Sequence, residues 1–228
     1  MSDAEVMPRE LVFVVDTSSS MHGRPIELAR AAMVRALAGL RATDTFRGLT
    51  FSDTTSALSE EALPATPANV ERGVRFVNEM RALGATEMLR GVRAALEPPT
   101  ESGRMRVVLL MTDGYVGNET EVFRAVHERL GQSRVFAFGV GSAVNRYLLT
   151  RLAEVGRGDT FVVTLDESPR EAADRFAERI ARPYLTDVSI DWGGLAVTDA
   201  YPRRLRTSTP IGRWSCTPAT RAARAATW

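Results

Sequence analysis

Residues 11–20 read LVFVVDTSSS, and this stretch decides the predicted fold. Five apolar residues follow one another without interruption and end at Asp16, a pattern typical of a strand buried on both faces. Strands covered on both sides occur mainly in parallel sheets that carry helices on each face. We therefore predict that residues 11–16 form a central strand of such a sheet, and that the polar residues after it form a loop at its carboxyl edge.

A second apolar run, MRVVLLMT at residues 105–112, also ends in a carboxylate, Asp113, which Gly114 follows. It predicts a second central strand. The carboxyl ends of parallel strands meet at one edge of the sheet, where ligands bind in α/β folds. Asp16 and Asp113 are therefore expected to be neighbours.

Helical and strand patterns alternate along most of the chain. This alternation predicts an α/β fold with a doubly wound, Rossmann-like and mostly parallel central sheet and helices on both faces. The predicted helices cover residues 25–41, 69–83, 88–96, 119–130, 145–155 and 168–181, and the other predicted strands cover residues 45–51, 55–58, 135–140 and 160–165.

The predicted α/β domain occupies residues 10–183, after an N-terminal extension of residues 1–9. Residues 184–202 alternate polar and apolar around Gly193 and Gly194, which predicts a C-terminal β-hairpin that belongs to a partial β unit. From Arg203 to the end, residues 203–228 show no periodicity and are rich in Arg, Thr and Ala, so we expect an irregular, disordered tail there.

The composition narrows the classes of partner. The 29 basic and 28 acidic side chains give a net charge of +1, and no apolar run reaches the length of a membrane span, so neither nucleic acid nor membrane insertion is expected. The first ten residues lack the basic and apolar segments of a secretory signal. A single cysteine, Cys216, excludes an internal disulfide and a cysteine-based zinc site.

The loop after the first strand places one carboxylate and two hydroxyls, on Asp16, Ser18 and Ser20, at alternate positions that a tight turn can direct to one point. Oxygen ligands without cysteine or histidine select a hard cation. A site with few carboxylates favours Mg²⁺, which keeps several waters, while Mn²⁺ and Ca²⁺ also fit.

These residues resemble the metal-ion-dependent adhesion site of the von Willebrand factor type A family, whose pattern is Asp-x-Ser-x-Ser, a distant Thr and a distant Asp. The distant positions map onto Thr86 and Asp113. The resemblance implies that Ser18, Ser20 and Thr86 offer hydroxyls to the metal, while Asp16 and Asp113 bind it directly or through water. It also implies an open coordination position, which we expect an acidic side chain of another protein to fill.

Further segments resemble a narrower subgroup, the inter-alpha-trypsin inhibitor heavy-chain-like proteins, with bacterial members that join a VIT domain to the adhesion domain. The resemblance covers about residues 10–202 and implies that the chain is a fragment of a longer bacterial protein. Full-length members are secreted or at the cell surface, so the location of this protein is left open. The segments are residues 44–46, 112–119, 140–145 and 191–194.

The function expected from these features is divalent-cation-dependent protein binding of the adhesion type, and not enzymatic. Two alternatives remain: a metal-dependent hydrolase of phosphoryl or ester substrates, and a scaffold that binds partners without metal. Neither a phosphate-cradling glycine loop nor a nucleophile elbow is present, and no general base is evident for a serine nucleophile. Loop residues expected to form a rim that selects the partner are Glu87, Tyr115, Asn118 and Glu119, with Ser52 and Asp53 as supporting groups.

Overall fold

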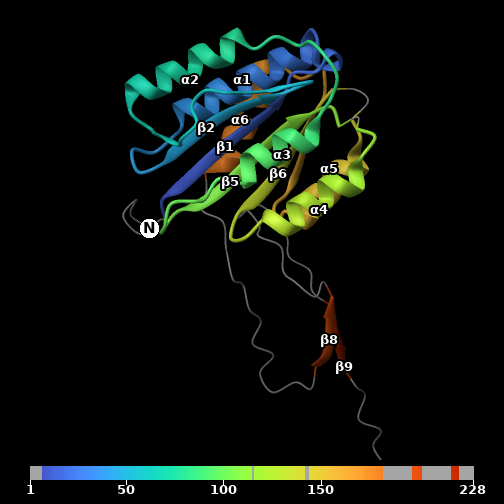
Figure 1. Cartoon of the computed structure of the whole chain (residues 1–228). Coiled ribbons are helices and arrows are strands. Elements are labelled where there is room, and N and C mark those ends of the chain that lie inside the picture. The colour runs from blue at the N-terminus through green and yellow to red at the C-terminus, as the bar shows by residue number, and fades with distance from the viewer. Residues whose placement is uncertain (1–6, 115, 142–143, 182–196, 202–216, 221–228) are drawn as a thin grey trace, which may run out of the picture. The chain divides into compact units, whose positions relative to one another are not determined.

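The computed structural model describes residues 7–114, 116–141, 144–181, 197–201 and 217–220. The chain divides into two compact units, Met1–Arg182 and Pro183–Trp228. The first unit is an α/β fold in which strands and helices alternate along the chain (Figure 1). Among the described residues, no helix has both the length and the apolar character needed to cross a membrane.

The central sheet of the first unit is mostly parallel, as the sequence predicts. Its strand order is β3-β2-β1-β5-β6-β7, with β4 also paired to β2. β1 lies between β2 and β5 and runs parallel to both, whereas β3 and β4 run antiparallel to β2. The strands are β1 (Arg9–Asp16), β2 (Thr45–Phe51), β3 (Thr55–Ala57), β4 (Leu63–Pro64), β5 (Met105–Thr112), β6 (Arg134–Val140) and β7 (Thr160–Val163).

Helices cover both faces of this sheet (Figure 1). On one face α3 packs against α4, and α4 against α5; on the other, α1 packs against α6 and α2. The predicted doubly wound fold class is confirmed. The helices are α1 (Arg24–Ala38), α2 (Pro67–Glu79), α3 (Met88–Leu96), α4 (Glu119–Arg129), α5 (Arg146–Val155) and α6 (Pro169–Ala181).

Side chains of the two central strands alternate between the two helical layers. Val12 and Val14 of β1 join Val108 and Leu110 of β5 in the buried core beneath α3, α4 and α5. All four side chains are at most 2% exposed. Each such residue stabilises the fold by roughly 1.5–3 kcal/mol, so β1 and β5 form a rigid base for the loops that follow them.

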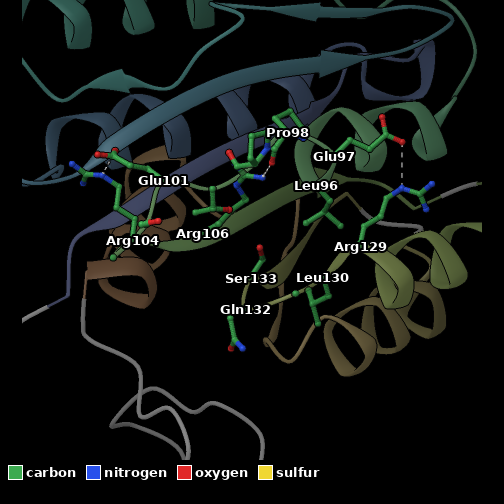
Figure 2. Close-up of a pocket in the computed structure, with 15 residues that line it drawn as sticks. Leu96, Glu97, Pro98, Glu101, Arg104, Arg106, Arg129, Leu130, Gln132 and Ser133 are labelled. Atoms are coloured by element: carbon green, nitrogen blue, oxygen red, sulfur yellow. Dashed lines mark hydrogen bonds and ion pairs between the residues drawn. The ribbon is translucent and has the colours of Figure 1, made fainter.

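The amino edge of the sheet buries charged side chains in pairs. The guanidinium of Arg106 donates to both carboxylate oxygens of Glu10 at 2.9–3.0 Å, and also to the carbonyls of Pro98 and Pro99. Figure 2 shows the pocket of about 400 Å³ at this edge, where Arg104 pairs with Glu101 and Arg129 with Glu97. The positive charges around this pocket are therefore already balanced.

Several element bounds differ from the sequence-based expectation within the first unit: α1 ends three residues early and β7 two residues early, and the end of α2 differs most. α2 ends at Glu79, four residues before the predicted end, because Met80 leaves the helical conformation and Leu83 donates its backbone N–H to Thr17 instead. A 3₁₀ helix, η2 (Ser19–Met21), and the short β4 are not predicted. Both are too short to produce a periodic pattern.

In the second unit, β8 (Val197–Tyr201) pairs antiparallel with β9 (Thr217–Thr220). Residues 217–220 therefore form a strand within the tail that the sequence predicts to be irregular. An alternating pattern identifies a strand but does not identify its partner. The predicted turn at Gly193 and Gly194, and the remainder of the tail, lie outside the described residues.

Candidate metal centre

Asp16 is the last residue of β1, and its side chain is fully buried. One carboxylate oxygen, Oδ1, accepts the Ser18 N–H at 2.8 Å, and Oδ2 accepts the Thr112 hydroxyl at 2.6 Å. Burial raises the pKa of Asp16 most strongly. Hydrogen bonds from the Ser18 hydroxyl, the Thr112 hydroxyl and the Ser18 N–H oppose the rise, and the charge of nearby Asp113 adds to it. Among the described residues, no Arg or His forms an ion pair with Asp16, in contrast to Glu10 at the opposite edge.

The two serine hydroxyls of the loop converge. The Oγ atoms of Ser18 and Ser20 lie 3.0 Å apart, close enough for a hydrogen bond. Ser18 is buried and Ser20 is exposed, so the pair leads from the buried carboxylate to the surface. The 3₁₀ turn η2 contains Ser20 and ends at Met21, whose fully buried side chain fixes the turn to the core.

A second loop, residues 80–87 between α2 and α3, docks onto the serine loop. Both the backbone N–H and the hydroxyl of Ser19 donate to the carbonyl oxygen of Gly84, at 2.9 and 3.0 Å. Gly84 has a φ of +90°, and a Cβ there would lie 2.2 Å from Oδ2 of Asp53. Glycine is required because this conformation and this close approach both exclude a side chain.

Thr86 is half-buried in the same loop, two residues before α3 begins. Both of its chain neighbours are held by the end of β2: the Ala85 N–H donates to Oδ1 of Asp53 at 2.9 Å, and the Glu87 N–H donates to the Ser52 carbonyl at 3.1 Å. Ser52 and Asp53 thus support the loop that carries Thr86.

Asp113 follows β5, the strand next to β1, and is half-buried. Its charge contributes to the raised pKa of Asp16, as expected for carboxylates at the ends of adjacent strands. Its backbone carbonyl accepts the N–H of Asn145 at 3.1 Å. Gly114, at a φ of +86°, lets the chain turn closely past the Asn145 side chain.

Two residues that shape the centre were not singled out from the sequence. Thr112 donates to Asp16 and accepts the Gly114 N–H at 2.9 Å, so it links both strand ends. Asn145 caps α5 through Leu148 and donates to the Glu119 carboxylate at 2.8 Å. A threonine directly before a strand-terminal Asp-Gly was the available signal for Thr112; no local signal identifies Asn145.

The predicted rim residues differ in their surroundings. Glu87 is exposed at the start of α3, and Asn118 is half-buried before α4. Glu119 is half-buried and accepts the Asn145 amide, so it already has a structural partner. Tyr115 lies outside the described residues.

The donor set fits a hard cation. In the described part of the chain, no three His, Cys, Asp or Glu side chains come together as a metal-binding group. Any cation at this edge would therefore depend on hydroxyls as well as on the two aspartates. The buried Asp16 carboxylate is repelled by Asp113 and has no ion-pair partner among the described residues. A cation bound beside it would therefore stabilise its charged form.

Comparisons with known sequences place the chain in a family. Residues 9–161 match the model described as von Willebrand factor type A domain. A von Willebrand factor A domain-containing protein of Dictyostelium discoideum is 25% identical over 198 residues, which cover 86% of this chain and 21% of that protein. Inter-alpha-trypsin inhibitor heavy chain H3 of Bos taurus is 26% identical over 207 residues, which cover 85% of this chain and 23% of that protein. The chain thus spans less than a quarter of the length of these relatives.

Solved structures share the fold at low sequence identity. A von Willebrand factor type A structure from Catenulispora acidiphila has a TM-score of 0.69 and 20% identity, over 77% of this chain and 42% of that chain. The manganese-loaded TRAP protein of Plasmodium vivax has a TM-score of 0.60 and 17% identity, over 75% of this chain and 74% of that chain. The mussel byssus proximal thread matrix protein 1 with a zinc-occupied MIDAS motif has a TM-score of 0.58 and 19% identity, over 75% of this chain and 46% of that chain.

The family model covers more than half of the chain, from the first residue of β1 into β7, and so includes both strands whose ends carry the candidate metal centre. The chain therefore belongs to the von Willebrand factor type A domain family.

Proposed function

We propose that this chain is a divalent-cation-dependent protein-binding module. The observation that carries the proposal is the placement of the Ser18 and Ser20 hydroxyls, 3.0 Å apart, beside a buried Asp16 that has no ion-pair partner among the described residues. Ser18 and Ser20 would offer hydroxyl oxygens to the cation, as would Thr86. Asp16 and Asp113 would bind it directly or through water.

Mg²⁺ is the favoured cation, with Mn²⁺ and Ca²⁺ as alternatives. Mg²⁺ is bound through one or two carboxylates and keeps several waters, which suits a site with two aspartates and three hydroxyls. Two solved structures of this fold carry a divalent metal by name, manganese in one and zinc in the other. They support a divalent cation in this fold and leave the choice of ion to experiment.

The cation would bind the partner through an open coordination position. Ser19 and Ser20 are exposed at this edge, so the site faces solvent beyond the buried Asp16. An Asp or Glu side chain of another protein would supply the remaining oxygen and the negative charge that the cation attracts. Residues 10–183 would form this binding domain within a longer protein, with residues 1–9, 184–202 and 203–228 outside it.

Hydrolysis is the less favoured function. The Ser18 hydroxyl contacts Ser20 and the Asp16 carboxylate, and both His22 and His127 are exposed rather than placed beside the serines. A serine nucleophile is usually activated by an adjacent histidine, and among the described residues no histidine lies beside Ser18 or Ser20. Phosphatase and esterase assays with Mg²⁺ present discriminate this alternative directly.

Metal-dependent recognition can be tested with a minimal ligand. A capped tripeptide of glycine, aspartate and glycine, at millimolar concentration, should shift the amide resonances of Ser19, Ser20 and Gly84 when Mg²⁺ is present. Chelator should abolish the shifts, and the same peptide with asparagine in place of aspartate should not produce them. Equal shifts with and without chelator would instead support the metal-independent scaffold.

A further inference from the structure

A pocket of about 440 Å³ lies directly beside the candidate metal centre. It is bordered by the turn between β2 and β3 and by the chain that leaves α2. One wall contains Thr17, the residue between Asp16 and Ser18, and another contains Asp53, which holds the Ala85 N–H next to Thr86. The pocket and the candidate metal centre therefore share two loops.

The lining of this pocket combines an apolar surface with oxygen atoms. Phe76, Met80 and Leu83 supply the apolar part, and the Leu83 side chain is 74% exposed. The oxygens come from the carboxylates of Asp53 and Glu79 and from nearby hydroxyls, which belong to Thr17, Thr50, Ser52, Thr54 and Ser56.

The two carboxylates of this pocket have no cationic partner in the described part of the chain. Asp53 accepts one backbone N–H, and neither Asp53 nor Glu79 forms an ion pair there. Arg81 is the one basic residue of the lining, and Arg30 of α1 donates to the Met80 carbonyl, but among the described residues neither arginine forms an ion pair with Asp53 or Glu79. The pocket at the opposite edge differs, because Arg104 and Arg129 are each paired with a glutamate (Figure 2).

We propose that this pocket, hereafter the side pocket, binds a basic side chain of the same partner that presents an acidic side chain to the cation. Arginine and lysine combine an apolar stem with a charged head, which matches the apolar surface beside Leu83 and the carboxylates of Glu79 and Asp53. An acidic side chain would be repelled, and a purely apolar one would leave the two carboxylates without a partner. This inference rests on the proposed function and adds the class of residue that the partner carries next to its acid.

The test compares capped tetrapeptides that begin with aspartate, continue with two glycines and end with arginine, lysine or glutamine. Their dissociation constants are measured by NMR titration with saturating Mg²⁺. The arginine and lysine peptides should bind about threefold more tightly than the glutamine peptide, the size expected for one exposed ion pair. The advantage should shrink at high salt because exposed charges are screened.

Two substitutions with opposite expected results show whether the preference for basic peptides arises in the side pocket. Glu79→Gln should remove most of the advantage of the basic peptides, whereas Arg81→Gln should increase it by about twofold, because it removes a competing positive charge. Glu61→Gln is the matched control: Glu61 is exposed near β4, which pairs with the first residues of β2, whereas Thr50, Ser52 and Asp53 of the side pocket lie at and beyond the end of β2. This control should leave all three dissociation constants unchanged.

The outcomes separate the two proposals. Equal affinity of the three peptides, each dependent on Mg²⁺, would overturn the side pocket and leave the proposed function intact. A charge preference that Glu79→Gln and Glu61→Gln reduce equally would also overturn it, because the effect would then come from net charge alone. Peptide binding that does not depend on Mg²⁺ would contradict the proposed function. If a preference for the arginine peptide remained in that case and Glu79→Gln removed it, the result would still support the side pocket.

Discussion

The Thr112 hydroxyl donates a hydrogen bond to Oδ2 of Asp16 over 2.6 Å, and both side chains are fully buried. This bond joins the ends of β5 and β1. Thr112→Val keeps the shape but leaves the Asp16 oxygen and the Gly114 N–H without this partner, which should lower the free energy of unfolding by about 1–3 kcal/mol. Denaturant unfolding measures this loss.

Thr112→Ser is the matched control, because it keeps the hydroxyl. It should retain most of the stability that the valine variant loses. If the serine and valine variants were equally destabilised, the packing of the threonine methyl group and not the hydrogen bond would be responsible.

Gly84→Ala tests the contact between the two loops. The change places a side chain at a φ of +90° and against Asp53, whose bond to Ala85 would be displaced. Gly103 has a φ of +80° with no atom within 4 Å, so Gly103→Ala has the backbone penalty without the contact. Calorimetric unfolding should show a loss of about 1–2 kcal/mol for Gly103→Ala and about 1 kcal/mol more for Gly84→Ala.

The same pair of variants distinguishes a local effect on the metal centre from general destabilisation. Gly84→Ala should weaken Mg²⁺ binding, because Gly84 accepts both Ser19 donors, whereas Gly103→Ala should not. Equal Mg²⁺ affinity in the two variants would show that the position of the loop does not affect the metal centre.

The buried ion pair at the amino edge should be far more sensitive than the exposed pairs. Glu10→Gln leaves the buried Arg106 guanidinium without its counter-charge, which should cost about 3 kcal/mol or more. Glu101→Gln breaks the pair with Arg104 at the surface and should cost less than about 1 kcal/mol. Comparable losses in denaturant unfolding would contradict this assignment.

Asp44 should contribute to the acid sensitivity of the fold. Burial alone would raise the pKa of Asp44, but hydrogen bonds and charges from Arg9 and Arg41 outweigh it and lower that pKa below 3.8. The unfolded chain then binds the proton more readily, so this contribution is present above pH 3.8 and is lost as the pH falls below it.

Asp44→Asn should therefore reduce stability at neutral pH and flatten its decline in acid. Asp174→Asn, which removes a half-exposed partner of Arg35, is the control and should leave the acid decline unchanged. Parallel declines for Asp44→Asn and the unsubstituted chain would show that Asp44 does not contribute.

The strands that carry the candidate centre could be predicted because their apolar runs are continuous and end abruptly in a carboxylate. β1 and β5 are found where those runs predict them, within two residues at each end. α2 could not be delimited in the same way, because its end depends on the hydrogen bond between Leu83 and Thr17, which only the folded chain forms.

The candidate site was predictable to a similar extent. Asp16, Ser18 and Ser20 lie on one loop, and the register of two parallel strands brings Asp113 to the same edge. Asn145 could not be identified, because it reaches the Asp113 loop across the sheet edge from the start of α5. The pairing of β8 with β9 likewise joins segments that no local pattern connects.

Calorimetric titration of the folded chain with Mg²⁺, repeated with Mn²⁺, tests the cation site most directly. We expect saturable binding of one ion per chain, and a marked loss of affinity in Asp113→Ala with little change in its unfolding midpoint. Undetectable binding of both ions by the folded chain, or equal affinity in Asp113→Ala, would contradict the assignment of this centre to a divalent cation.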